Sequence, residues 1–188
     1  MSSATPDEAL TTALVAELAK KTGVCWLAYD RWNRRETEHV PHAAWHVWLE
    51  DEDGGALYVV HEGAEQPLPG LRDAERVEVV MRSKDNGGRL VTWVATPTAV
   101  LPGDERWETV TAALVGGRLN LPDLKTAVAE WERSSLVTRL APTGELVEAP
   151  DALTDDAHLA EPRPTPATTR GALPRVLHRR VRRRPRLS

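Results

Sequence analysis

Three histidines lie close together in the sequence, at a density that metal sites often show. His39, His42 and His46 fall in a segment where apolar and polar residues alternate, which predicts a β-strand. On a strand, His42 and His46 would lie about 13 Å apart, because each residue advances the chain by about 3.3 Å. His39 would point to the opposite side from both. We therefore predict no metal site and interpret these residues as strand histidines, partly exposed or hydrogen-bonded.

The single cysteine and the known catalytic motifs offer little further chemistry. Cys25 lies among apolar neighbours, which is typical of a buried small side chain, and one cysteine excludes an internal disulfide framework. The chain contains no Gly-x-Ser-x-Gly elbow, no phosphate-binding Gly-x-x-x-x-Gly-Lys loop and no Gly-x-Gly-x-x-Gly fingerprint. These absences exclude the hydrolases, nucleoside triphosphatases and Rossmann dehydrogenases that depend on such motifs.

A group of cations flanks the strongest turn signal in the chain. Arg82, Lys84 and Arg89 lie on either side of an Asn-Gly pair, which supplies the positive φ angles that a tight hairpin needs. Such a group either forms an anion site that could take a phosphate or is the solvated tip of a hairpin.

Seven tryptophans and no phenylalanine make tryptophan the dominant aromatic residue. Trp107 and Trp131 recur on helical apolar stripes and Trp45 on an apolar strand face, so these three are predicted in the core. Trp48 and Trp93 could instead line a pocket or a subunit interface, where a flat aromatic cofactor or simple packing would suit them.

Period-two alternation and turn residues predict a β-meander that carries these side chains. In the segment 42–49 the residues Ala43, Trp45, Val47 and Leu49 share one face. The polar segment 31–40 is predicted as a loop or an exposed strand end. The patterns predict strands over 24–29, 42–49, 56–61, 77–83, 89–100 and 134–140, and helices over 7–21, 104–115 and 122–131. A meander of this kind closes into a barrel or packs against helices to hide its edges.

Composition divides the chain into a body, residues 1–147, and a tail, residues 148–188. The tail is rich in Pro and Arg, which predicts disorder. The segment 151–188 has nine Arg and four acidic residues, a net charge of +5, which leaves −9 for the first 150 residues. The seven arginines in 175–186 are either a solvated extension or an arm that contacts nucleic acid or anionic lipid. With no signal peptide and no long apolar run, we expect a cytoplasmic protein.

The order of these elements resembles the pyridoxamine 5'-phosphate oxidase-like FMN-binding split-barrel family. The likeness covers about residues 8 to 141 and is carried by the segments Pro41-His-Ala-Ala-Trp-His-Val-Trp, Gly55-Ala-Leu-Tyr-Val-Val-His, Val77-Glu-Val-Val-Met-Arg and Gly88-Arg-Leu-Val-Thr-Trp-Val-Ala. It implies a mainly β (α+β) fold, a six-stranded Greek-key split β-barrel with flanking helices. It also implies a homodimer and FMN or a deazaflavin at the dimer interface, in an oxidoreductase-like protein. The candidate cofactor-binding residues are then His61, Gln66, Arg82, Lys84, Arg89 and Trp93.

The chain departs from the family where phosphate-binding cations are expected after the strand that ends at His61. It has Glu65-Gln66-Pro67 there, and a glutamate beside a phosphate is electrostatically unfavourable unless it is protonated or turned away. Either Arg82, Lys84 and Arg89 take the phosphate, or the protein binds no cofactor. Two alternatives to the oxidoreductase follow. One is a non-catalytic dimeric split-barrel module that has lost the flavin, and the other is a protein whose basic tail docks nucleic acid or a partner.

Overall fold

The computed structural model describes residues 6–33, 36–51, 53–83, 88–118, 123, 125–149 and 152–153, with the side chains of 6–11 and of residue 33 excepted. All of these residues belong to the first of two units, Met1–Thr154. The tail predicted over 148–188 lies almost wholly outside the described residues, and so does the Asn-Gly pair of the predicted hairpin.

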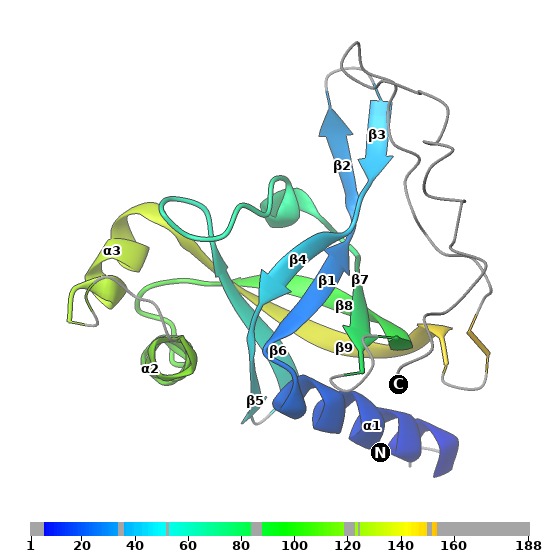
Figure 1. Cartoon of the computed structure of the whole chain (residues 1–188). Helices are drawn as coiled ribbons and strands as arrows, with labels where there is room; N and C mark the ends of the chain where they lie inside the picture. The colour runs from blue at the N-terminus through cyan, green and yellow to red at the C-terminus, as the bar shows by residue number, and fades with distance from the viewer. Residues whose placement is uncertain are drawn as a thin grey trace, which may run out of the picture. The chain divides into compact units, whose positions relative to one another are not determined.

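The described residues form a mainly β structure with three α-helices (Figure 1). In chain order the elements are α1 (Pro6–Lys21), β1 (Val24–Ala28), β2 (Asp30–Asn33), β3 (Glu36–His39), β4 (His42–Trp45), β5 (Val47–Asp51), β6 (Gly54–His61), the 3-10 turn η1 (Leu71–Asp73), β7 (Val77–Arg82), β8 (Arg89–Val100), α2 (Trp107–Gly117), α3 (Ala127–Ser134) and β9 (Leu136–Glu148). None of the described helices is long and apolar enough to cross a membrane.

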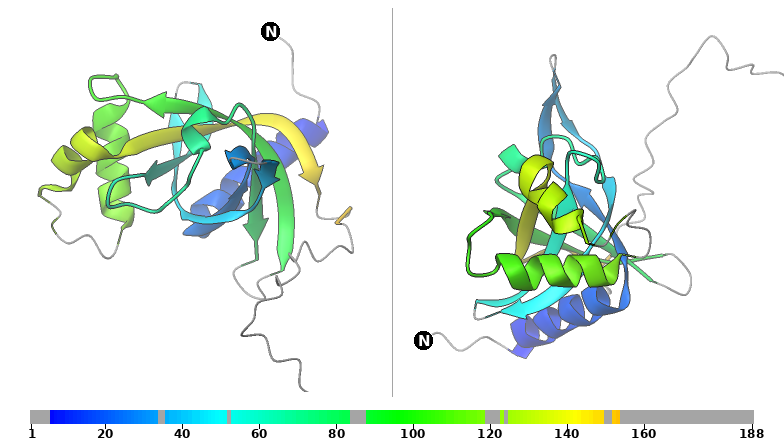
Figure 2. Two further views of the ribbon diagram at one scale, coloured as in Figure 1. Left: turned by 90° about the horizontal axis from the view of Figure 1, so that it is seen from above. Right: turned by 90° about the vertical axis from the view of Figure 1, so that its left-hand side faces the viewer.

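Seven of these strands pair antiparallel in one sheet, in the order β4-β1-β7-β8-β9-β6-β5. The sheet curls into a half-barrel, while β2 and β3 form a separate hairpin that projects from it (Figures 1 and 2). The two edge strands, β4 and β5, are consecutive in the sequence and are separated only by His46. One short stretch of chain therefore supplies both edges of the sheet.

The strand predicted over 42–49 is divided at His46, whose backbone continues the pairing with the segment before β1 while its ring bonds to α1. Its backbone N–H donates to the carbonyl of Gly23 at 3.3 Å, and its ring Nε2 lies 3.1 Å from the carbonyl oxygen of Ala19 in the last turn of α1. The His46 side chain is buried. The described sheet thus contains seven strands where the sequence predicted six.

Two apolar clusters lie on opposite sides of β6, which explains why its sequence is almost continuously apolar. Leu57 and Val59 enter a cluster inside the curled sheet, where Val15 and Ala19 of α1 also pack. Tyr58 and Val60 point the other way, into a cluster that α2 and α3 cover with Trp107, Val110, Leu114, Ala127 and Trp131. Alternate residues of a strand point to opposite faces, so each face of β6 has its own core.

Several predicted boundaries differ from those observed. The segment 31–40 forms the β2–β3 hairpin, in which Arg31 binds Glu38 at 2.6 Å across the two strands. The helix predicted over 104–115 runs from Trp107 to Gly117, and the one predicted over 122–131 is described from Ala127 to Ser134. The strand predicted to end near residue 140 continues to Glu148.

Burial of His46 predicts a specific dependence of stability on pH. Burial lowers the pKa of His46 below its ordinary value. Just below pH 6.5 the unfolded chain therefore binds a proton that the folded chain does not. The contribution of neutral His46 to the free energy of unfolding is complete above that pH. It is lost as the pH falls toward the folded-state pKa, by up to about 1.4 kcal/mol per pH unit. Urea unfolding at pH 7.5 and 5.5 measures this loss.

The variant His46→Gln retains an N–H donor for Ala19 but cannot be protonated. We expect it to reduce the difference in unfolding free energy between the two pH values. Part of the difference will remain, because burial also lowers the pKa of His42 and of His61. An unchanged difference in His46→Gln would contradict the assignment.

Candidate functional site

The end of β6 and the loop after it bring together His61 and Gln66, two of the predicted cofactor-binding residues. The two residues form an isolated parallel bridge. The His61 side chain is fully buried, and its Nε2 lies 2.9 Å from the hydroxyl oxygen of Thr138 on β9. Burial lowers the pKa of His61, so a neutral ring is favoured.

Gln66 makes three hydrogen bonds with the backbone of Trp45, at the end of β4, and of Val60, on β6. Its Oε1 accepts from the N–H of Trp45 at 2.9 Å, and its Nε2 donates to the carbonyls of Trp45 at 3.0 Å and Val60 at 3.1 Å. The amide thus completes the hydrogen bonding of the edge strand where the ladder stops. In the structure Gln66 connects β4 to β6.

Glu65 is turned away from any ligand that would bind at this loop. Its carboxylate forms an ion pair with Arg118, which follows α2, and accepts a hydrogen bond from the indole Nε1 of Trp131 on α3 at 2.8 Å. Arg118 also lies over the ring of Trp45, with its guanidinium carbon 5.2 Å from the ring centroid. The loop after β6 therefore uses its charge to attach the two helices to the sheet.

The predicted cations Arg82 and Arg89 are cross-strand neighbours at the ends of β7 and β8. Arg89 is largely buried and binds Glu148 at 2.7 Å, and Glu148 also accepts a hydrogen bond from the Thr92 hydroxyl at 2.8 Å. Arg82 is exposed and stacks on Trp26 of β1, with its guanidinium carbon 4.3 Å from the ring centroid. Among the described residues, no carboxylate forms an ion pair with Arg82. Lys84 lies outside the described residues.

Trp93, the last predicted site residue, lies in the interior of the sheet. Its side chain is 1% exposed, and its ring meets the partly buried ring of Trp48 edge to face, with centroids 6.4 Å apart. The two tryptophans, which the sequence suggested could line a pocket or a subunit interface, pack together at the inner core cluster. Its indole Nε1 is buried and has no hydrogen-bond partner among the described atoms.

The structure therefore brings the candidates together as two groups. His61 and Gln66 lie at the end of β6, and Arg82 and Arg89 lie at the end of the β7–β8 pair. Trp26 and Glu148 contact Arg82 and Arg89 but carry no local signal in the sequence, because each meets its partner from a distant strand. In the described part of the chain no group of three or more His, Cys, Asp and Glu side chains could hold a metal ion.

Comparison with known proteins finds similarity at the level of fold. No family model matches the chain, and no curated protein matches it. A conserved hypothetical protein from Mycobacterium tuberculosis superposes with a TM-score of 0.50 at 14% identity, over 70% of this chain and 79% of that one. A heme storage protein from Vibrio cholerae gives 0.48 at 15% identity, over 71% and 91%. A putative pyridoxamine 5'-phosphate oxidase from Listeria innocua gives 0.46 at 15% identity, over 73% and 98%.

The resemblance to the pyridoxamine 5'-phosphate oxidase-like split-barrel proteins is thus confirmed as a likeness of fold. At these sequence identities the likeness assigns neither a cofactor nor a reaction.

The contacts of Gln66 predict that its replacement destabilises the fold. Gln66→Leu removes all three hydrogen bonds and leaves backbone groups of Trp45 and Val60 unpaired, so we expect a loss of about 2–4 kcal/mol in unfolding free energy. Gln66→Glu keeps the acceptor for the Trp45 N–H but places a carboxylate oxygen against the carbonyls of Trp45 and Val60, so it should also lose stability at neutral pH. Chemical denaturation of the three proteins measures the series, and wild-type stability in Gln66→Leu would contradict this structural role.

Proposed function

We propose that this protein binds a flavin-type cofactor, FMN or a deazaflavin, as an oxidoreductase-like member of the split-barrel class. Support comes from the family resemblance in element order, since the mainly β architecture with helices that it implied agrees with the curled sheet and three helices of the described residues. When bound, such a cofactor would supply the hydride transfer, and the protein would supply its position and surroundings. We expect a homodimer, as the resemblance implies.

The Arg82–Arg89 pair is the observation that carries this proposal. Two arginines placed opposite each other on paired strands repel, unless anionic groups compensate them. Glu148 compensates Arg89. Arg82 has no carboxylate partner among the described residues, while Trp26 holds its guanidinium at the surface. A phosphate at this position would be compensated by charge-assisted hydrogen bonds.

We also interpret β4 and β5 as one strand bent at His46. Counted in this way the described sheet has six strands, and its two edges meet at the bend, as in the six-stranded Greek-key barrel that the resemblance implies. Support for this comes from Gln66, which bonds to the backbone of Trp45 just before the bend and to that of Val60 on β6, the strand that pairs with β5.

Titration of FMN against tryptophan fluorescence tests the cofactor proposal. Trp26 lies next to Arg82, so a flavin whose phosphate binds there should quench its emission, and Arg82→Ala should weaken binding about tenfold. Arg133→Ala, an exposed arginine on α3, makes the same change in charge and should leave the affinity unchanged. Riboflavin, which lacks the phosphate, should bind wild type more weakly than FMN, and a phosphorylated deazaflavin should be titrated in parallel.

A non-catalytic module that has lost the flavin is the second candidate, and the internal contacts of the other predicted ligands favour it. His61 bonds to Thr138, Gln66 bonds to backbone, and Trp93 lies in the core. If neither FMN nor the deazaflavin quenches wild-type fluorescence at millimolar concentration, this candidate replaces the first. Equal loss of FMN affinity in Arg82→Ala and Arg133→Ala would remove the Arg82 site.

A further inference from the structure

At the end of the β7–β8 pair, Arg89 is bound to an anion that belongs to the chain itself. Its Nη1 lies 2.7 Å from Oε1 of Glu148, the last residue of β9. The other carboxylate oxygen of Glu148 accepts a hydrogen bond from the Thr92 hydroxyl at 2.8 Å. The Glu148 side chain is 6% exposed and that of Arg89 is 18% exposed. The ion pair is therefore largely desolvated, and its charges are less screened than those of a surface pair.

Strand register places Glu148 on the same face of the sheet as the two arginines. One row of directly paired residues crosses β1, β7, β8 and β9, and consists of Trp26, Val80, Thr92 and Glu148. Side chains that lie directly opposite each other on paired strands share a face. From the neighbouring pair, Arg82 stacks on Trp26 and Arg89 reaches Glu148. An anion that contacted both arginines would therefore come close to the Glu148 carboxylate.

The charges of these three residues favour one anion at a time. Arg82 and Arg89 together carry two positive charges, and Glu148 reduces the net charge to +1. A phosphate monoester carries a charge of about −1.5 to −2 at neutral pH. Such a group and the two arginines balance each other, whereas the addition of Glu148 leaves an excess of negative charge and sets two anions side by side. Like charges in close contact destabilise a site, so the carboxylate and a phosphate compete for Arg89.

The end of β9 is weakly supported by the backbone ladder. Thr92 pairs with Glu148, but the next pair along the strands is Trp93 with Leu146, which leaves Val147 as an extra residue. The Val147 side chain is 46% exposed. A proline follows Glu148 two positions later and has no N–H to extend the pairing. A bulge of this kind re-aims a side chain or ends a ladder, and here it delivers Glu148 from a strand end.

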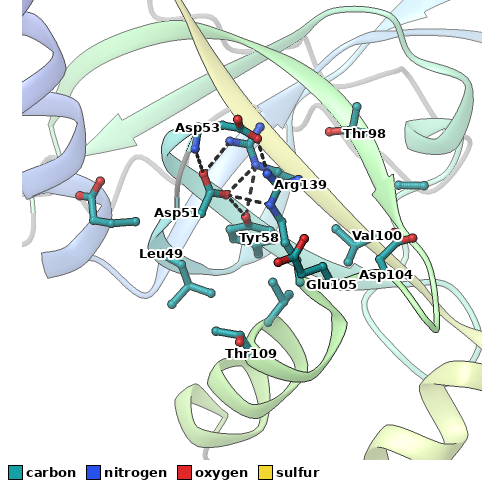
Figure 3. Close-up of a pocket in the computed structure, with 14 residues that line it drawn as sticks. Leu49, Asp51, Asp53, Tyr58, Thr98, Val100, Asp104, Glu105, Thr109 and Arg139 are labelled. Atoms are coloured by element: carbon teal, nitrogen blue, oxygen red, sulfur yellow. Dashed lines mark hydrogen bonds and ion pairs between the residues drawn. The ribbon is translucent and has the colours of Figure 1, made fainter.

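A second buried arginine of β9 shows a contrasting, fixed ion pair. Arg139 donates from Nε to Asp51 at 3.1 Å, and the same carboxylate accepts the hydroxyl hydrogen of Tyr58 at 2.7 Å (Figure 3). Asp51 pairs with Gly54 at the turn of the β5–β6 hairpin, so the chain on both sides of this carboxylate is held in the sheet. Glu148 has paired strand on one side only. Of these two carboxylates, Glu148 is the one that can leave its arginine without opening a hairpin.

We propose that Glu148 regulates the anion site as an internal competitor, which occupies Arg89 in the free protein and leaves it when a phosphate group binds Arg82 and Arg89 together. The competing ligand is the phosphate of the cofactor proposed above, so the competition rests on that proposal for the identity of the ligand. Removal of the Glu148 charge should strengthen phosphate binding. A residue that only shapes the site would have the opposite effect, because its replacement would weaken binding.

Titration of the full chain with two probes at low ionic strength tests this competition. FMN binding is followed by tryptophan fluorescence, and inorganic phosphate by the rise in melting temperature at matched ionic strength. We expect Glu148→Gln, which keeps an acceptor for Arg89 and Thr92, to bind both probes about fivefold more tightly than wild type. Glu145→Gln, an exposed glutamate of the same strand that pairs with Arg76, makes the same change in charge and should bind as wild type does. Thr92→Val loosens Glu148 without removing its charge, so its affinity should lie between those of wild type and Glu148→Gln.

The two probes separate the competition from the cofactor proposal. If FMN binds wild type and a folded Glu148→Gln binds it no more tightly, the competition is wrong and the cofactor proposal stands. If no variant binds FMN but Glu148→Gln binds phosphate more tightly than wild type and Glu145→Gln do, the competition stands and the cofactor is wrong. Equal gains in Glu148→Gln and Glu145→Gln would show an effect of net charge alone and overturn the competition.

Two further outcomes complete the test. Absence of binding of either probe to every variant would overturn the competition together with the cofactor proposal. If Glu148→Gln does not fold, Thr92→Val decides the question, and an affinity no higher than that of wild type would overturn the role of Glu148.

Discussion

The bend at His46 is the constraint on which the rest of the fold depends. Because β4 and β5 are opposite edges of the same sheet, the residue between them determines how closely those edges approach. The ring of His46 is bonded to α1 through Ala19, and Gln66 bonds the adjacent backbone to β6. These contacts hold the sheet curled around its inner cluster, with α1 packed against that cluster. They also satisfy backbone groups of the edge strand, which would otherwise be free to pair with another chain.

The need to pair buried polar groups also explains the contacts of the loop after β6. A buried polar side chain needs a partner, and in this loop each partner comes from a different element. Glu65 reaches Arg118 and Trp131, and Gln66 reaches Trp45. Residues at the position where the resemblance led us to expect phosphate-binding cations thus attach helices and strands to one another in this chain. Burial lowers the pKa of Arg118, whereas the ion pair with Glu65 favours its charged form. An added anion here would compete with that pair.

Local periodicity and turn residues were enough to predict most helices and strands. They did not predict the bends and strand ends that depend on contacts with residues distant in the sequence. The alternation in 77–100 and the apolar run 56–60 predicted β6, β7 and β8, and the helical stripes predicted α1 and α2. The bend at His46 could not be predicted, because its acceptor on Ala19 lies 27 positions earlier. The length of β9 was underestimated for the same reason, since Glu148 is held by Arg89, 59 positions away. For the site, the sequence indicated that Arg82 and Arg89 flank a turn but not that they lie opposite each other, and nothing near Glu65 in the sequence indicated Arg118.

The net charge of the body determines which ligands its long-range field attracts. The first 150 residues have a net charge of −9, so the long-range field of this part of the chain repels anions and attracts cations. At physiological ionic strength that field is screened over about 8 Å, and recognition of an anion depends on the groups in direct contact with it. Arg82 meets this condition, because stacking on Trp26 keeps its guanidinium at the surface while Glu148 neutralises its neighbour Arg89. An anionic cofactor would therefore depend on one local pair of arginines in a body whose net charge opposes it.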